Sequence, residues 1–410
     1  MGLTRAVGTE QHPGGRFGAT LGGAAFGQQL VVNSVPNILL AVQIEQIDPA
    51  DKALRLGIAT GIAGLLVCLA QPTWGMVSDR SRSRFGRRAP FILGGAIVTA
   101  VGLLSLAVTD TFVGLLIIWC LTATAVTAGQ AALGAVLPDR VSASARGVFA
   151  AVIGLGGVIG TLVGQIAIAK LVRGGFLLPY AVLAIVLVGS ALLFVIVNPE
   201  PRADVPAAGR ISLRALWIDP RRHPDFAWVL VSRFLVMTGF LMINGYLLYV
   251  LSDYVGLGRD RALHQIPLIS AISLVFVIAS LVGGGIWSDR AGRRKPFVFW
   301  SALVLGAGLI LPLFVGTVPG MLASAAVIAL GYGTFRAIDM AVVTLVLPSR
   351  EAAAQHIGIA YLAEHLGAAA GPVLAGVVIT AGGGYAALFG IAAACAVGGA
   401  LCILPVRSVR

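Results

Sequence analysis

The stretch that decides the fold is Gly75–Phe91, GMVSDRSRSRFGRRAPF, because a second copy of it, GIWSDRAGRRKPF, occupies Gly285–Phe297. The Gly-x-x-Ser-Asp-Arg parts of the two copies lie 210 positions apart, and a Leu-Pro-x-Arg segment that starts at Leu137 returns at Leu347 with the same offset. This spacing indicates two similar halves rather than a solenoid, whose repeats are about 20–50 residues long. We therefore expect two equivalent helical bundles joined by one linker.

The composition excludes a water-soluble protein. Hydrophobic residues make up 58% of the 410-residue chain and charged residues 11%, and the mean hydropathy is +0.94, whereas soluble domains carry about 25% charged residues. Apolar runs recur at about 20 residues, the length that crosses a bilayer as a helix. These runs do not alternate as the strands of a membrane barrel do. The sequence thus predicts an all-α integral membrane protein.

Twelve apolar runs, bounded by charges, Gly and Pro, are the predicted membrane helices. They cover residues 19–44, 54–77, 90–109, 112–137, 147–171 and 176–197 in the first half, and 226–250, 266–287, 296–315, 319–347, 355–380 and 385–404 in the second. The predicted organisation is a tail at 1–18, a six-helix bundle at 19–197, a linker at 198–225, a second bundle at 226–404 and a tail at 405–410. This pattern is typical of a transporter whose halves rock about a central site.

The positions of Lys and Arg predict the orientation. If both termini are cytoplasmic, 21 of the 29 basic residues fall on that side, six fall on the other, and Arg233 and Arg336 lie inside helices. Cytoplasmic loops are enriched in Lys and Arg, so we expect this topology. The net charge of +12 then reflects topology, and we expect no nucleic acid partner. The four cysteines lie in apolar runs without ligand spacing, so no metal or cofactor is expected.

The repeated loops also resemble a known family. The Gly, Asp-Arg and paired-Arg pattern after the second predicted helix resembles the signature of the major facilitator superfamily. Its longer form, from Asp79 to Phe91, is similar to the glycoside–pentoside–hexuronide and sucrose-type symporter branch and related bacterial permeases, as are Ser232–Gly256 and Gly331–Pro348. The resemblance implies a monomeric twelve-helix secondary transporter in a bacterial inner membrane. Its implied partners are a small solute, protons and the lipid bilayer, with a sugar or glycoside as substrate.

The sequence departs from that branch in one respect. Sugar symporters of the branch carry a membrane-embedded carboxylate in the N-terminal half, but the central turns of the first six predicted helices contain no Asp or Glu. A coupling carboxylate therefore belongs to the second half or is absent. A proton-antiport exporter of drug-like or secondary metabolites and a non-transporting sensor or scaffold stay open as alternatives. No P-loop, nucleophile elbow or metal motif is present in the sequence, so we expect no enzyme.

Ionisable residues within the predicted helices are the first candidates for coupling and binding. Arg336 and Asp339 are three positions apart on the tenth predicted helix and share a face. Glu364 lies near the middle of the eleventh helix, and Arg233 lies about two turns into the seventh. A charge at such depth costs about 2.5–3.5 kcal/mol on insertion scales, so it faces a cavity or a partner. These residues either bind substrate and protons or form structural ion pairs; Arg233 either pairs with Asp339 or extends to the interface.

Uncharged polar residues are the second group of candidates. Gln29, Asn33 and Asn37 are four positions apart and form a stripe on the first predicted helix, which we expect to line the central cavity. The alternative role of the stripe is hydrogen bonding between helices. Further candidates for substrate contact are Asn244, Gln130, Gln165, Tyr246 and Tyr249. The two tyrosines are equally typical of an interfacial aromatic belt.

The repeated loops predict a gate on the cytoplasmic side. The candidates are Gly75, Asp79, Arg80, Gly86, Arg87 and Arg88 in the first copy, and Gly285, Asp289, Arg290, Gly292, Arg293 and Arg294 in the second. By resemblance, the carboxylate of Asp79 is a latch that meets a neighbouring helix N-terminus and nearby arginines only when that side is closed. The alternative is a topology determinant, because arginines hold a loop in the cytoplasm.

Overall fold

The computed structural model describes residues 14–81, 83, 85–142, 145–199, 221–348 and 353–408. Most of the predicted tail at 1–18 and of the predicted linker at 198–225 lies outside these residues. Within the described ranges the protein is helical and contains no strand. The prediction of an all-α membrane fold is therefore confirmed.

The first membrane crossing is an α-helix that is interrupted by one π-helical turn. A π-helical turn, η1 (Val35–Leu39), interrupts the path between α1 (Gly15–Ser34) and α2 (Leu40–Ile47). Pro36 lies at the start of this turn, where the missing N–H of proline removes one bond of the helical ladder. The other segments of this half are α3 (Lys52–Asp79), α4 (Ala89–Ala107), α5 (Phe112–Arg140), α6 (Arg146–Leu171), η2 (Val172–Gly174) and α7 (Leu177–Val197).

The second half repeats this layout with breaks of its own. Its segments are α8 (Pro224–Asn244), α9 (Leu247–Tyr249), η4 (Val250–Tyr254), α10 (Arg259–Ala291), α11 (Lys295–Ile310), η5 (Leu311–Leu313), α12 (Val318–Leu345), α13 (Ala353–Val378), η6 (Ile379–Gly383) and α14 (Gly384–Ile403). The helix α10 begins at Arg259 rather than at the predicted 266, because its polar first turns extend beyond the apolar run.

The number of crossings agrees with the sequence prediction. The described residues contain eleven helical stretches that are long and apolar enough to span a membrane, and the last, His356–Ile403, is 48 residues long. This stretch holds two crossings, α13 and α14, joined at η6. Gly382 and Gly384 have φ values of 91° and 59° there, a conformation that favours glycine. The described chain therefore crosses twelve times.

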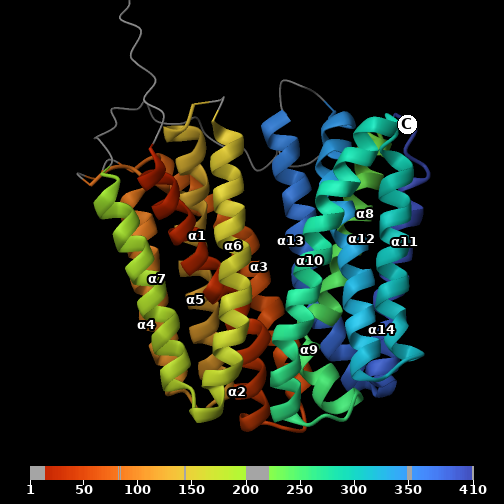
Figure 1. Ribbon diagram of the computed structural model, residues 1–410, viewed down its shortest axis with the longest axis horizontal. Coiled ribbons are helices and arrows are strands. Elements are labelled where there is room, and N and C mark those ends of the chain that lie inside the picture. Colours follow the sequence, from red (N-terminus) through yellow and green to blue (C-terminus); the bar gives the residue numbers. More distant parts are fainter. Residues whose placement is uncertain are drawn as a thin grey trace, which may run out of the picture.

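The two halves stand side by side (Figure 1). In the first half α1 packs against α6 and α7, and in the second α12 packs against α10 and α11. Between the halves, α3 contacts α13 and α6 contacts α10. Glycine allows the α3–α13 contact, because a Cβ at Gly57 would lie 2.6 Å from the carbonyl oxygen of Pro372.

The helix directions define two ends of the molecule. We call the end at which α3, α5, α10 and α12 finish, and at which the C-terminus lies, the terminal face; it is at the top of Figure 1. The end at which these four helices begin is the far face. The short segments α2 and α9 lie toward the far face, near the bottom of the view. Both faces carry contacts that bear on function.

Candidate functional site

A cavity of about 240 Å³ lies between the two halves. The first half contributes residues from α1 and α6, and the second half contributes residues from α8, α9, α10 and α12. The polar lining residues are Asn33, Thr161, Gln165, Asn244, Ser270, Ser273, Ser324 and Tyr332. Among the described residues that line the cavity there is no Asp, Glu, Lys, Arg or His. The cavity is therefore a site of hydroxyl and amide groups within apolar walls.

The wall from the first half is held by hydrogen bonds and close helix packing. The Nδ2 of Asn33 donates to the hydroxyl of Thr161 at 3.0 Å and to the carbonyl oxygen of Gln29 at 3.1 Å. The helices α1 and α6 lie close together because a Cβ at Gly160 would be 2.4 Å from the carbonyl oxygen of Phe26. The amide of Asn33 is thus fixed at the edge of the cavity.

Only part of the predicted polar stripe lines the cavity. The stripe expected at Gln29, Asn33 and Asn37 is broken, because Asn37 lies in the π-helical turn η1, which shifts the register by one residue. The side chain of Gln29 accepts a hydrogen bond from Gln130 Nε2 at 3.5 Å. Gln29 and Gln130 therefore join α1 to α5 and are not cavity-lining residues. Of the stripe, Asn33 alone reaches the cavity.

A stacked aromatic pair forms part of the wall from the second half. The rings of Phe240, on α8, and Tyr332, on α12, have centroids 4.1 Å apart and planes 8° apart. Both residues line the cavity. Neither residue was predicted from the sequence, because single aromatic residues in apolar helices are common. Asn244, which the sequence did predict, lies one turn beyond Phe240 and also lines the cavity.

Four charged residues form a buried cluster in the second half. The guanidinium of Arg233 contacts Asp339 Oδ2 at 3.1 Å and also bonds Glu364. The other carboxylate oxygen of Glu364 accepts a hydrogen bond from Arg336 Nη1 at 2.6 Å. The side chains of Arg233 and Asp339 are only 1% and 5% exposed. Two cations and two anions thus balance each other, which stabilises charges that would be costly alone.

The pairing differs from the simplest reading of the sequence. Arg336 and Asp339 share a face of α12 but do not pair with each other; their partners lie on α13 and α8. Arg233 does not extend to the interface and is buried against Asp339 and Glu364. The ring of Tyr361 lies 5.4 Å from its guanidinium. The cluster therefore joins three helices, α8, α12 and α13.

The charged cluster lies next to the cavity on the side of the terminal face. Tyr332 precedes Arg336 by four residues on α12, a rise of about 6 Å at 1.5 Å per residue. Arg233 precedes Phe240 by seven residues on α8, a rise of about 10 Å. The aromatic pair thus stands between the cluster and the cavity. Each of the two helices presents its charges and its cavity residues along one face.

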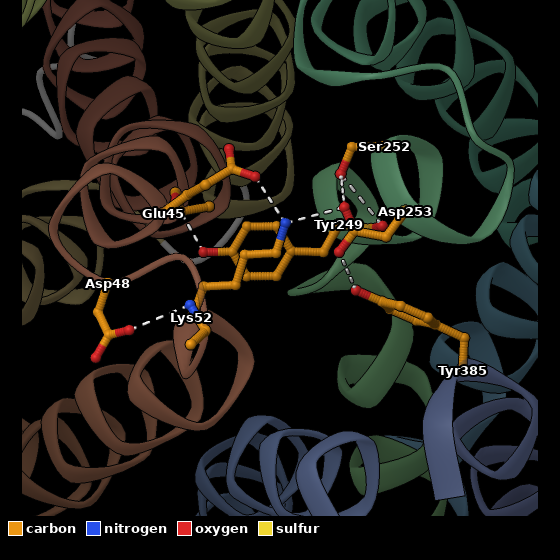
Figure 2. A network of polar contacts seen from close by, with 9 residues as sticks. Glu45, Asp48, Lys52, Tyr249, Ser252, Asp253 and Tyr385 are labelled. Atoms are coloured by element: carbon orange, nitrogen blue, oxygen red, sulfur yellow. Dashed lines mark hydrogen bonds and ion pairs between the residues drawn. The ribbon is translucent and has the colours of Figure 1, made fainter. Parts of the chain in front are cut away.

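At the far face, ion pairs join the two halves (Figure 2). Lys52 Nζ, from the first half, lies 2.6 Å from Glu45 Oε1 and 2.9 Å from Asp253 Oδ1 of the second half. The carboxylate of Asp253 also accepts hydrogen bonds from the hydroxyls of Tyr385 and Ser252, both at 2.7 Å. Asp253 is therefore held by its own half while it binds Lys52 of the other.

Two tyrosines that were candidates for substrate contact instead join the halves. The hydroxyl of Tyr246 donates to the carbonyl oxygen of Ala53 at 2.7 Å, and that of Tyr249 donates to Ala41 at 2.7 Å. Both tyrosines are almost completely buried, and neither lines the cavity. The ring of Tyr249 lies 4.8 Å from Lys52 Nζ. These contacts close the molecule at the far face.

At the terminal face, the first repeated loop forms an ion network within one half. Asp79, at the end of α3, lies 2.5 Å from a guanidinium nitrogen of Arg88, which is the residue before α4. Arg88 and Arg87 both contact Asp139 Oδ2, at 2.9 Å and 2.5 Å. Asp139 was not predicted as a site residue, although it occupies the variable position of the repeated Leu-Pro-x-Arg segment. Gly86 follows Phe85 with a φ of 97°, which lets the loop turn into α4.

The second repeated loop makes a weaker pair. Asp289 lies 3.6 Å from Arg294, and the side chain of Asp289 is 73% exposed. Gly292 ends α10 with a φ of 62°. The remaining predicted residues at the ends of α3 and α10 are Gly75, Arg80, Gly285, Arg290 and Arg293. Within the described part of the chain, equal motifs in the two halves thus have unequal contacts.

Comparisons with known proteins agree with this geometry. Residues 20–284 and 257–410 match the family described as Major Facilitator Superfamily. Three solved structures share the fold, each at 14% sequence identity. A single-substitution variant of the nucleoside transporter NupG has a TM-score of 0.80 and covers 95% of this chain and 99% of its own. NupG itself has a TM-score of 0.73 and covers 96% of this chain and 100% of its own.

The third structure is a bacterial homolog of the human lysosomal transporter Spinster, in an inward-facing and occupied conformation. It has a TM-score of 0.71 and covers 95% of this chain and 93% of its own. At such low identity the three structures show the fold alone, whereas the family match extends over nearly the whole chain. The chain therefore belongs to the major facilitator superfamily and is a membrane transporter rather than an enzyme.

Proposed function

We propose that this protein is a proton-coupled transporter of a small hydroxylated solute, a sugar or glycoside, in a bacterial inner membrane. The observation that carries the proposal is the position of the uncharged polar cavity, between the two halves, directly beside the buried charged cluster. The cavity supplies a solute site, and the cluster supplies carboxylates that are able to take up a proton. Alternating access then requires only that the halves rock about the cavity.

The lining of the cavity supports the substrate class. Hydroxyl and amide side chains offer both donors and acceptors, which hydroxyl-rich solutes need once they leave water. The aromatic surface of Tyr332 and Phe240 suits the apolar face of a sugar or base ring. A volume of about 240 Å³ lies below the common range for drug-sized ligands, about 300–1,000 Å³. A nucleoside, the solute class in the name of NupG, is itself a glycoside and falls within this proposal.

The charged cluster supports proton coupling. Asp339 and Glu364 lie on α12 and α13, and α13 is also the helix that packs against α3 of the other half. Protonation of either carboxylate would leave the two arginines with one anion between them. The ion pairs among α8, α12 and α13 would then rearrange, and α13 would pass this change to the interface between the halves.

The far-face contacts support an alternating-access cycle. With the terminal face taken as cytoplasmic, as the distribution of Lys and Arg predicts, the contacts of Lys52, Tyr246 and Tyr249 close the external side. The arrangement is then the inward-facing one. Outward opening must break the bond between Lys52 and Asp253 and the two tyrosine hydrogen bonds.

Uptake into proteoliposomes tests the proposal. Labelled hexoses, disaccharides and nucleosides are offered with and without an imposed pH gradient to the wild type, Asp339→Asn and Glu364→Gln. We expect gradient-driven uptake in the wild type, and its loss in at least one variant with solute exchange across the membrane retained. Asp110→Asn is the matched control, because Asp110 is an exposed carboxylate outside the cluster.

Three outcomes would contradict the proposal. Gradient-driven uptake that survives in both cluster variants would mean that the cluster is structural. Efflux of lipophilic cations, with no uptake of any sugar or nucleoside by the wild type, would favour the exporter alternative. A wild-type protein that moves no solute in either direction would favour the sensor or scaffold alternative.

A further inference from the structure

We propose that the stacked pair of Phe240 and Tyr332 restricts the cavity to uncharged solutes, because it separates the cavity from the cation of Arg336. This inference rests on the proposed function and narrows its substrate class. Uronates and nucleotides would be rejected, whereas hexoses, neutral glycosides and nucleosides would be accepted. Selectivity would thus depend on two aromatic residues that make no ion pair themselves.

The first step is the charge of the cavity wall. Every described lining residue is apolar or uncharged at neutral pH. An ionic group that leaves water for such a wall loses its hydration and gains no counterion. A hydroxyl group in the same place regains hydrogen bonds from Asn33, Ser273 or Asn244. The wall therefore favours a neutral solute as soon as the two halves close over it.

The second step is the position of the nearest cation. Arg336 is one helical turn from Tyr332 and on the same face of α12, and its side chain is 32% exposed. Among the described residues its ion-pair partner is Glu364. Arg336 would be a natural partner for a solute carboxylate, but it does not line the cavity. What lies between them is the ring of Tyr332.

The third step is the stack itself. A ring separation of 4.1 Å with an 8° tilt means that Phe240 and Tyr332 cover each other over most of their faces. Because they come from α8 and α12, they join the two helices that also hold Arg233 and Arg336. The stack thus presents uncharged aromatic surface to the cavity, with Arg336 outside the lining.

Binding of matched solute pairs tests the proposal. The probes are glucose and glucuronate, and uridine and its 5′-carboxylate, measured by equilibrium binding to purified protein in detergent. We expect the wild type to bind the neutral member of a pair at least tenfold more tightly than the acid. In Phe240→Ala and Tyr332→Ala the affinity for the acid should rise at least tenfold. Tyr332→Phe, which keeps the stack, should reject the acid as the wild type does.

Two further variants complete the test. One asks whether the gained binding of the acid depends on Arg336, and the other tests the proposal even if the stack variants do not fold. Arg336→Gln added to Tyr332→Ala should remove the gained binding of the acid, because the cation would be lost. Asn244→Lys places a cation in the cavity wall and leaves the stack intact, so it should admit the acid even if the stack variants do not fold. Equal affinity of the wild type for both members of a pair would overturn the proposal. Rejection of the acid by a folded Tyr332→Ala protein would also overturn it.

These results separate the inference from the proposed function. Neutral solutes that bind and enter without proton coupling would contradict the proposed coupling and leave the selectivity intact. Coupled uptake of neutral and acidic members alike would contradict the selectivity alone. A wild-type protein that binds neither member of either pair would contradict both.

Discussion

The bond between Lys52 and Asp253 is expected to set the balance between the closed and open far face. Lys52→Met removes this bond, which crosses the halves at 2.9 Å, and leaves Glu45 and Asp253 close together without a cation (Figure 2). A hydrogen bond to a charged group contributes about 1.5–3 kcal/mol. Because the two side chains are 15% and 31% exposed, solvent screening reduces this to about 1–1.5 kcal/mol. The closed population should therefore fall about tenfold relative to the open one.

Distance measurements between spin labels at the far face report this balance. Asp110→Cys labels the α4–α5 connection of the first half, and Phe314→Cys labels the segment after η5 in the second; both residues are exposed. The four native cysteines are replaced first so that only these positions react. In Lys52→Met the distribution should gain a longer-distance component that is weak in the wild type.

A matched control lies on the same face. Arg55 pairs with Asp48 at 2.5 Å, and both belong to the first half, so Arg55→Met removes an ion pair that does not cross the halves. It should leave the label distances unchanged. The exchange of Lys52 and Asp253, as Lys52→Asp with Asp253→Lys, should return the distribution toward that of the wild type. Identical distributions in the wild type and Lys52→Met, or equal shifts in both single variants, would refute the reasoning.

Three other substitutions and one control have definite expected results. Arg233→Met leaves two buried carboxylates without their shared cation and should destabilise the protein by about 3–5 kcal/mol, seen as a lower melting temperature in detergent. Gly61→Val should lengthen the far-face label distance, because even a Cβ there would lie 2.1 Å from Val373 Cγ2; Gly75→Ala, with no atom within 4 Å of its Cβ, should not. Asp139→Asn weakens the terminal-face network and should lower stability by about 1–2 kcal/mol without changing that distance; a change in distance would contradict this.

The crossings could be predicted because the bilayer imposes them. An apolar run of about 20 residues has few alternatives to a spanning helix, and the repeat of Gly75–Phe91 fixed how the runs divide into halves. Position in the chain likewise predicted which charged residues lie deep in the membrane, namely Arg233, Arg336, Asp339 and Glu364. That these charges would contact partners was therefore predictable, because charges at such depth must face a partner or a cavity.

The identity of those partners could not be predicted. Arg336 and Asp339 are neighbours along one helix, but a guanidinium reaches far enough to prefer a carboxylate on another helix. Whether Glu364 or Asp339 is within reach of Arg336 depends on how α12 and α13 are rotated about their axes. The apolar residues that set this rotation are too similar to one another for the sequence to indicate which of them face the neighbouring helix. The π-helical turn at η1, which removed Asn37 from the expected stripe, is a further local change without a clear sequence signal.

The unequal contacts of the two repeated loops bear on where the protein changes shape. In the first half Asp139 binds the two arginines before α4 and so ties the end of α5 to the start of α4. The matching position of the second half is Ser349, which lies outside the described residues and has no carboxylate to offer. Among the residues that the structure describes, Asp289 makes one distant, exposed ion pair, with Arg294. No described contact of the second half corresponds to the one that Asp139 makes with Arg87 and Arg88 in the first. We expect a change of charge in the cluster to move helices of the second half, while the first half rotates as a body.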